Sequence, residues 1–318
     1  MGVYRLIYEQ LPATYNIMIA IVCHDAGGAE ILSSWVLQSQ SAHCFVLAGP
    51  AVKIFERKVG KCELTGLDEA IRLSDWVLCG TSWQSTLEKQ AIVQGKATGK
   101  KVIAFLDHWV NYPMRFQLEG VTVLPDEIWV GDTDAGKIAQ KIFPKIKVVL
   151  TPNPYFEDLQ IELQVIQESS NHSRQGSVLY VCEPTREHAL LAYGDERYWG
   201  YTEEDALQYF LKNIEALGSV VREIKIRPHP SERKNKYDWA RRLSSLVIET
   251  ASNKLLAEQI VEADVVVGCG SMAMVVALLA KKRVISSIPP GGKACALPQV
   301  EIEHLQVLVT KYRESLYG

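Results

Sequence analysis

A histidine between two prolines is the first pattern in the sequence that points to chemistry. Residues 223–232 read EIKIRPHPSE, so His229 follows an apolar run and lies between Pro228 and Pro230. Proline lacks an N–H and fixes φ, which prevents the segment from continuing as a central strand. We therefore predict that His229 lies at a strand end, where its imidazole can contact a ligand.

A serine at a predicted helix start is the second candidate. In GCGSMAMVVALLAKK (268–282) small residues join an apolar run to a helical stretch, and Ser271 stands between Gly270 and Met272. Ser271 can cap this helix, and the free N–H groups of a first helical turn also bind anions. The same turn geometry serves both roles. Together with Arg227 and His229, this turn would suit a phosphate or diphosphate.

Two segments of the first half supply candidate carboxylates. In HDAGGAE (24–30), Gly27 and Gly28 allow a tight turn close to a ligand, and Asp25 either faces that ligand or caps the following helix. In FLDHWVNYPMRF (105–116) a buried strand is followed by a dense polar and aromatic cluster that includes Asp107, His108 and Arg115. Such a cluster is costly to bury without purpose, so we predict a functional loop.

Metal and hydrolase chemistries find no support in the sequence. GDTDAG (131–136) has D-x-D spacing, but it follows a predicted strand and opens a predicted helix, so Asp132 and Asp134 are explained as helix-capping residues. The H-E-x-x-H, G-x-S-x-G, Walker A and G-x-G-x-x-G patterns are missing. We therefore expect neither a bound metal nor another cofactor.

These candidates follow short apolar runs that alternate with longer amphipathic stretches. NIMIAIVC, HCFVLAG, DWVLCG, KVIAFLD, EIWVGD and KVVLTPNP are the runs of the first half, and SVLYVCEP, EIKIRPHP, SLVIET, ADVVVGCG and RVISSIPP are those of the second. Runs that are apolar at nearly every position are typical of parallel strands covered by helices on both faces. Both halves are therefore predicted to be α/β.

A polar, turn-rich stretch divides the chain. We predict an N-terminal Rossmann-like domain over 1–166, a linker over 167–177 (QESSNHSRQGS) and a C-terminal Rossmann-like domain over 178–318, facing each other across a cleft. SDWVLCGTS (74–82) and ADVVVGCGS (263–271) are similar to each other, and each precedes a helical stretch and a further strand. This repetition favours two similar domains with ligands at the carboxyl ends of their strands.

Composition narrows the choice of partners. The chain has 318 residues, 47% of them hydrophobic and 22% charged, and 34 Lys and Arg against 37 Asp and Glu give a net charge of −3. No basic field favours nucleic acid. The seven scattered cysteines are typical of reduced thiols in a cytoplasmic protein. No apolar run has the length of a transmembrane helix or the flanks of a signal peptide, although peripheral contact with a membrane stays open.

RPHP followed by ADVVVGCGSMAMVVALLAKKRVIS resembles the donor half of GT-B glycosyltransferases, particularly bacterial capsule and lipopolysaccharide transferases. In the similar bacterial sialyltransferases an HP motif and a serine motif hold the phosphate and ribose of a CMP-sugar. The resemblance places the HP motif on His229 and Pro230 and the serine motif on Ser271. It covers roughly residues 220–290, and it implies that the last helix packs back on the N-terminal domain.

One feature departs from this family. Many GT-B relatives carry a Glu a few residues into the helix after the serine motif, where it contacts the ribose of the nucleotide. This chain has MAMVVALL there, and Val275 and Val276 cannot accept a hydrogen bond from a hydroxyl group. The nucleotide is therefore not identified by the resemblance.

The function predicted is a metal-independent glycosyltransferase that moves a sugar from a nucleotide donor, with CMP as one option, to a glycan or lipid-linked acceptor in surface polysaccharide synthesis. Alternatives are a nucleotide-sugar 2-epimerase, a glycerol-phosphate-type polymer transferase and a nonenzymatic sugar-nucleotide-binding protein. The predicted catalytic residues are Asp25, Asp107 and His108. The predicted substrate- and nucleotide-binding residues are Gly27, Gly28, Arg115, Glu183, Arg227, His229, Pro230, Ser231, Gly270, Ser271 and Met272.

Overall fold

The computed structural model describes residues 17–170, 175–233, 235–243, 246–250 and 254–317. Contacts divide the chain into two units, with the boundary between Tyr155 and Phe156. Each unit is described by itself below. The boundary lies within helix α7, Pro154–Ser169, which also includes the start of the predicted linker 167–177. Residues 171–174 of that linker lie outside the described residues, and the predicted domain limits stay a prediction.

Six parallel strands form the sheet of the first unit, in the order β2-β1-β3-β4-β7-β8. Strand β1, MIAIVC, is apolar throughout and almost completely buried, as expected for a central strand between two layers of helices. The strands are β1 Met18–Cys23, β2 Ala42–Leu47, β3 Trp76–Cys79, β4 Lys101–Leu106, β7 Glu127–Val130 and β8 Lys147–Leu150. A separate antiparallel pair consists of β5 Gln117–Leu118 and β6 Val121–Thr122.

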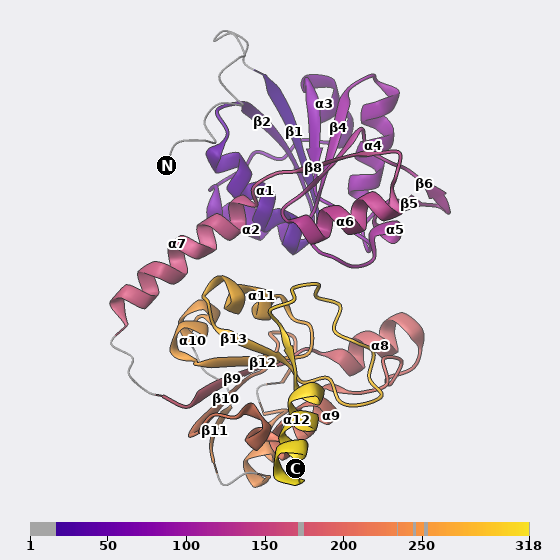
Figure 1. Cartoon of the computed structure of the whole chain (residues 1–318). Coiled ribbons are helices and arrows are strands. Elements are labelled where there is room, and N and C mark those ends of the chain that lie inside the picture. Colours follow the sequence, from indigo (N-terminus) through magenta and orange to yellow (C-terminus); the bar gives the residue numbers. More distant parts are fainter. Residues whose placement is uncertain (1–16, 171–174, 234, 244–245, 251–253, 318) are drawn as a thin grey trace. The chain divides into compact units, whose positions relative to one another are not determined.

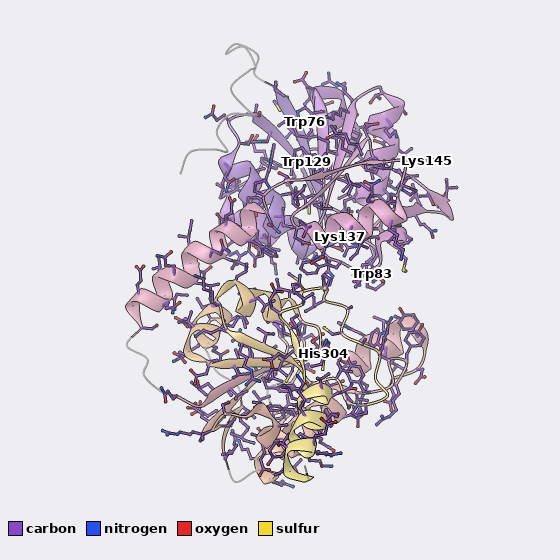
Figure 2. The ribbon with its side chains drawn as sticks, in the orientation of Figure 1. Trp76, Trp83, Trp129, Lys137, Lys145 and His304 are labelled. Atoms are coloured by element: carbon purple, nitrogen blue, oxygen red, sulfur yellow. The ribbon has the colours of Figure 1, made fainter. Side chains whose placement is uncertain are left out.

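Helices cover both faces of this first sheet. The helices of this unit are α1 Ala26–Gln38, α2 Pro50–Lys58, α3 Leu67–Leu73, α4 Leu87–Ala97, α5 Tyr112–Arg115 and α6 Thr133–Ile142. Helix α1 packs against α2, and α3 packs against α4; Figure 1 shows these pairs on opposite sides of the sheet. Among the side chains drawn in Figure 2, the rings of Trp76 and Trp129 have centroids 6.3 Å apart, and Trp35 lies 6.0 Å from Trp76.

The second unit also has a six-stranded parallel sheet, in the order β11-β10-β9-β12-β13-β14. The strands are β9 Ser177–Val181, β10 Glu223–Arg227, β11 Val247–Thr250, β12 Val265–Gly268, β13 Arg283–Ser286 and β14 Glu303–His304. Strand β10, EIKIR, alternates between buried Ile224 and Ile226 and partly exposed charged residues. Its two faces therefore differ in polarity, whereas β9 and β12 are buried along their whole length.

The helices of the second unit complete its core. They are α8 Thr185–Tyr193, α9 Glu203–Lys212, α10 Leu256–Glu262, α11 Met272–Leu279 and α12 Leu305–Tyr317, with short 3-10 helices η1 Ile214–Leu217 and η2 Asp238–Arg242. Leu305 and Val309 of α12 are buried in one cluster with Leu207 and Phe210 of α9. The apolar face of the last helix is thus buried within the second unit.

Both sheets are doubly wound, so the predicted α/β fold with two Rossmann-like units is confirmed. Numbered within its own unit, the first sheet has the strand order 2-1-3-4-5-6 and the second has the Rossmann order 3-2-1-4-5-6. The direction of winding reverses between β1 and β3 in the first sheet and between β9 and β12 in the second. In the described part of the chain, no helix combines the length and hydrophobicity that a membrane span requires.

Candidate functional site

The turns that follow β1 and β3 meet at the switch point of the first sheet. Strands β1 and β3 are adjacent and parallel, so their carboxyl ends lie at the same edge. The turn after β1 holds Asp25, and the turn after β3 holds Thr81 and Ser82, with Trp83 next to them partly exposed (Figure 2). Ligands of doubly wound folds bind at such switch points, so these turns form the candidate site of the first unit.

Asp25 is fixed at this edge through one of its two carboxylate oxygens. Its Oδ1 accepts a hydrogen bond from Ser82 Oγ at 2.8 Å and lies 2.8 Å from His24 Nδ1. Asp25 occupies the N-cap position of α1, but its side chain makes no capping hydrogen bond. The capping interpretation of Asp25 is therefore not supported by the structure. Oδ2 makes no hydrogen bond to any described residue, which leaves it able to contact a ligand.

Asp107 is also held through one carboxylate oxygen, and one of its partners is Thr81, the residue next to Ser82. Its Oδ1 accepts hydrogen bonds from Arg115 Nη1 at 2.5 Å and from Thr81 Oγ1 at 3.3 Å. The Asp107 and Arg115 side chains are both less than a tenth exposed. Among the described residues, Oδ2 has no hydrogen-bond partner. Consecutive residues of one turn thus anchor two carboxylates, each with one oxygen unbonded.

Arg115 stabilises the loop after β4 through hydrogen bonds within the protein. Besides Asp107, its Nη1 donates to Thr81 O at 3.1 Å and Thr81 Oγ1 at 2.9 Å, and its Nε donates to Val110 O at 3.2 Å. These bonds join the loop after β4 to the turn after β3. The predicted contact of Arg115 with substrate stays a prediction, because the described bonds of this side chain are all internal.

The glycines of the first turn are required by their close neighbours. A Cβ atom at Gly27 would lie 2.1 Å from Asp107 Oδ2. A Cβ atom at Gly28 would lie 3.3 Å from Cys23 Sγ and 3.4 Å from the Cα atom of Gly80. The absence of side chains at these positions lets the turn after β1 approach both the carboxylate of Asp107 and the end of β3.

His108 is largely withdrawn from solvent. Burial lowers the pKa of its imidazole, the charge of Asp107 raises it and the charge of Arg115 lowers it further, with a net lowering. His108 Nδ1 accepts a hydrogen bond from the N–H of Trp109 at 2.9 Å, so the neutral ring carries its proton on Nε2. His108 makes no hydrogen bond to Asp107 in the described structure. The predicted catalytic role of His108 is therefore supported only by its proximity to Asp107.

The sequence interpretation missed Glu88, the most unusual carboxyl group of the first unit. Glu88 is 1% exposed; its Oε1 accepts a hydrogen bond from the N–H of His24 at 2.7 Å, and its buried Oε2 has no hydrogen-bond partner. Burial raises the pKa of Glu88. Lys89 is also almost buried, and burial lowers the pKa of its ammonium group. The sequence offered one signal for this group: Glu88 and Lys89 are adjacent charged residues on the first turn of α4, a helix that begins near Asp25 in the fold.

In the second unit, His229 lies where predicted, after the end of β10. Its Nδ1 accepts a hydrogen bond from the N–H of Ser231 at 3.2 Å and contacts Ser231 Oγ at 2.7 Å. Burial lowers the pKa of His229. Because Nδ1 accepts the N–H bond of Ser231, the neutral ring carries its proton on Nε2. No described residue forms a hydrogen bond with Nε2. The exposed residues Pro230 and Ser231 thus belong to a loop that displays one ring N–H.

Glu232 holds this histidine loop in place and was also missed. Its buried side chain accepts hydrogen bonds from the N–H of His229 at 2.8 Å, from Tyr237 Oη at 2.7 Å and from Lys236 Nζ at 2.9 Å. Glu187, Glu203 and Glu232 are close enough together to hold a metal ion, but Lys236 Nζ forms an ion pair with each of them. An ammonium group of the chain itself therefore occupies the position between these carboxyl groups.

Arg227 is turned toward a neighbouring helix. Its Nη1 donates hydrogen bonds to Lys254 O at 3.0 Å and to Gln259 Oε1 in α10. Strand alternation explains the direction, because Lys225, two residues earlier, forms an ion pair with Glu262 of α10 on the same face. The structure does not bring Arg227 and His229 together through a described contact, and the ligand role of Arg227 stays a prediction.

Glu183 follows β9, and its carboxylate contacts the turn that precedes α11, a helix whose first residue is the predicted ligand Met272. Glu183 Oε1 accepts hydrogen bonds from the N–H groups of Gly270 at 2.7 Å and of Cys269 at 3.3 Å. Ser271 is the N-cap of α11, and its Oγ accepts a hydrogen bond from the N–H of Ala273. The predicted ligand residues of this turn thus lie next to the carboxylate of Glu183.

Comparisons with known proteins reveal the fold. No protein-family model and no curated protein matches the sequence. The structure is similar to UDP-GlcNAc 2-epimerase from Neisseria meningitidis bound to UDP-GlcNAc (TM-score 0.57, 11% identity, covering 95% of this chain and 92% of that one). It is also similar to a glycosyltransferase from Rickettsia africae (0.56, 13%, 96% and 90%) and to an alpha/beta-galactoside alpha-2,3-sialyltransferase from Photobacterium phosphoreum (0.50, 9%, 92% and 100%). At these identities the likeness establishes an α/β fold of two Rossmann-like units, as in GT-B enzymes.

Proposed function

We propose that this protein is a glycosyltransferase that uses a nucleotide-sugar donor. The observation that carries the proposal is the pair of carboxylates at the switch point of the first unit, each anchored through Oδ1 and unbonded at Oδ2. A base that abstracts a proton needs this arrangement, because the anchored oxygen fixes the orientation while the other oxygen accepts the proton. A protein that only binds nucleotides has no need of two such groups.

The proposed roles are divided between the units. In the second unit, the Nε2–H of His229 donates a hydrogen bond to the phosphate of the donor, and its orientation is fixed by the Ser231 contact to Nδ1. In the first unit, Asp107 or Asp25 removes the proton from an acceptor hydroxyl group. The oxygen then attacks the anomeric carbon, and the bond from that carbon to the phosphate oxygen breaks, releasing the nucleotide. In a retaining variant of the reaction, a carboxylate would be the nucleophile.

The fold and the sequence motifs also support the proposed type of reaction and the proposed acceptor. Solved structures with the same fold include a glycosyltransferase and a sialyltransferase. The resemblance of the RPHP and GCGS segments to transferases of surface polysaccharides favours a glycan or lipid-linked acceptor and a cytoplasmic reaction. The proposed reaction invokes no metal, because the His229 Nε2–H and the Ser271 hydroxyl group can donate hydrogen bonds to the phosphate.

A nucleotide-sugar 2-epimerase is the second candidate, and two observations favour it. The structures with this fold include several UDP-GlcNAc 2-epimerases, at 9–12% identity. The first unit also offers a third carboxyl group, Glu88, whose pKa burial raises toward the range useful for acid and base catalysis. An epimerase needs groups that remove and return a proton, so this set of carboxyl groups is compatible with either reaction.

One experiment separates the candidates. The protein is incubated with CMP-, UDP-, GDP- and CDP-activated sugars, with and without oligosaccharide acceptors, and the products are analysed by mass spectrometry and NMR. A transferase releases nucleotide slowly to water and faster with an acceptor, and an epimerase yields an isomerised sugar nucleotide. Binding without either product would contradict both enzymatic proposals. Asp107→Asn is the matched variant, in which release should be lost while nucleotide binding is kept.

A further inference from the structure

Glu183 fills the part of the second unit that would otherwise bind phosphate. It follows β9, next to β12, at the switch point of this sheet. Its Oε1 lies 2.7 Å from the amide nitrogen of Gly270 and 3.3 Å from that of Cys269. These N–H groups precede α11, a helix of eight residues. The amides that an incoming phosphate would need are thus already bonded to an anion from the chain itself.

Among the described residues, no cationic side chain forms an ion pair with Glu183. Burial raises the pKa of Glu183, and hydrogen bonds from the N–H groups of Gly270, Cys269 and Ser271 lower it, with a net raising. These N–H groups and the dipole of α11 are what stabilises its charged form. A second anion on the same turn would compete with Glu183 for these N–H groups and would be repelled by the ionised carboxylate.

Few hydrogen-bond donors remain for a ligand in this region. His229 Nε2 has no partner among the described residues, whereas Arg227 donates to Lys254 and Gln259. Ser271 Oγ accepts a bond from Ala273 and retains one hydroxyl proton to donate. The N–H groups of Cys269 and Gly270 are used by Glu183. The available donors suit one phosphate group better than two.

We propose that Glu183 takes the place of a second phosphate, so that the donor of this protein carries a single phosphate between nucleoside and sugar. This inference rests on the proposed function. It assigns a specificity-determining role to Glu183, which excludes nucleoside diphosphate sugars by occupying the amides of Cys269 and Gly270. The carboxylate of Glu183 thereby determines whether the donor carries one phosphate or two, because it is already bonded to these amides before a donor binds.

The test compares CMP with CDP and UMP with UDP by calorimetric titration. The titrations are made at about pH 8, where the phosphates are ionised because their second pKa is about 6. Wild-type protein should bind each diphosphate no more tightly than the corresponding monophosphate. Glu183→Ala vacates the turn, and Glu183→Gln removes the charge while retaining a side chain of the same size. Glu183→Ala should bind the diphosphates about tenfold more tightly than wild type, a change of about 1.4 kcal/mol, with monophosphate affinity little changed. Glu183→Gln keeps an oxygen that can accept the same N–H bonds, so its gain should be smaller.

Glu301→Gln is the matched control, because it removes the same charge from an exposed residue of the second unit that forms no hydrogen bond with the α11 turn or the histidine loop in the described structure. Its ratio of diphosphate to monophosphate affinity should equal that of wild type. The inference is overturned if wild type prefers diphosphates by tenfold or more, or if the Glu183 variants leave the ratio unchanged.

A second readout does not depend on nucleotides. Pyrophosphate is titrated into ¹⁵N-labelled protein while the amide resonance of Gly270 is followed. Glu183→Ala should show a saturable shift of this resonance, and wild type should show none. Equal shifts in both proteins, or no shift in either, would contradict the role of Glu183. If no nucleotide binds to any variant, the proposed function fails, and the pyrophosphate titration still decides what Glu183 does.

Discussion

Asp107 is a proposed catalytic base, and one of its oxygens is bonded to Arg115 and Thr81 while the other has no hydrogen-bond partner among the described residues. Asp107→Asn should lower turnover by about a hundredfold or more while donor affinity stays close to wild type, because the amide cannot accept the proton. Steady-state kinetics and calorimetric titration of the donor measure the two quantities. Asp134→Asn, which changes a carboxylate in an exposed ion pair with Lys137, is the control. Full turnover in Asp107→Asn would move the catalytic role to Asp25.

His229 is the residue on which nucleotide affinity is expected to depend. Replacement of His229 by Ala removes the Nε2–H donor and should weaken nucleotide binding by about 1.5–3 kcal/mol, the range for hydrogen bonds to charged groups. Thermal unfolding should change little, because Glu232 bonds to the main-chain N–H of residue 229 rather than to its ring. His304→Ala, which changes an exposed histidine of β14, should bind nucleotide as wild type does. Unchanged affinity on titration of His229→Ala would exclude His229 from the site.

Glu88 gives a prediction for the dependence of stability on pH. Burial raises the pKa of Glu88, so the native state keeps this proton at pH values where the unfolded chain has released it. This contribution to stability is present below the ordinary pKa of a glutamate and is lost as the pH rises through the raised pKa. Glu88→Gln has no proton to release, so that decline should disappear. Urea unfolding across this pH range measures it, and the exposed Glu162→Gln should behave as wild type.

At the scale of residues, the sequence indicates the types of groups at the strand ends but not their partners. Asp25, Asp107 and His229 were predictable because each follows an apolar run. The bond of Ser82 to Asp25 and that of Arg115 to Asp107 join segments 57 and 8 residues apart, which no local pattern reveals. Glu183 could be proposed as a ligand-binding residue, yet its bonds to the turn before α11 depend on the adjacency of β9 and β12.

Among the elements, the first turn of α1 has no room for a side chain at Gly27. Gly27→Ala places a Cβ atom against Asp107 Oδ2, which must move. Overpacking of this kind costs about 1–3 kcal/mol of unfolding free energy, and turnover should fall because the carboxylate is displaced. Denaturant unfolding and kinetics measure both effects. Gly66→Ala is the control, since a Cβ atom there meets nothing within 4 Å. Wild-type turnover in Gly27→Ala would separate Asp107 from the reaction.

The apolar runs predicted every strand of the two six-stranded sheets except β14. All eleven runs form strands, because a run buried on both faces is distinctive in sequence. Strands β5, β6 and β14 have two residues each and show no such run. Within β10 the alternation of EIKIR set the direction of Arg227 toward α10, and the sequence interpretation did not use it.

At the scale of the whole molecule, the tryptophans distinguish the two units. Five of the seven, Trp35, Trp76, Trp83, Trp109 and Trp129, precede the boundary at Tyr155, and Trp199 and Trp239 follow it. A nucleotide bound only by the second unit stabilises that unit by mass action. Hydrogen exchange at the turns of His229 and Ser271 should therefore slow, while denaturant unfolding followed by tryptophan fluorescence shifts little. Protection confined to Gly27 and Gly28 would place the nucleotide on the first unit.

The contact between Gly27 and Asp107 also has a consequence for evolution. The missing side chain at position 27 makes room for the carboxylate at position 107, eighty residues away in the chain. A lineage that lost the reaction would be released from both requirements together. Descendants in which position 107 has become small are therefore expected to accept alanine or serine at position 27, whereas those that keep the aspartate are expected to keep the glycine. Paired change at these two positions would mark inactive descendants of this fold.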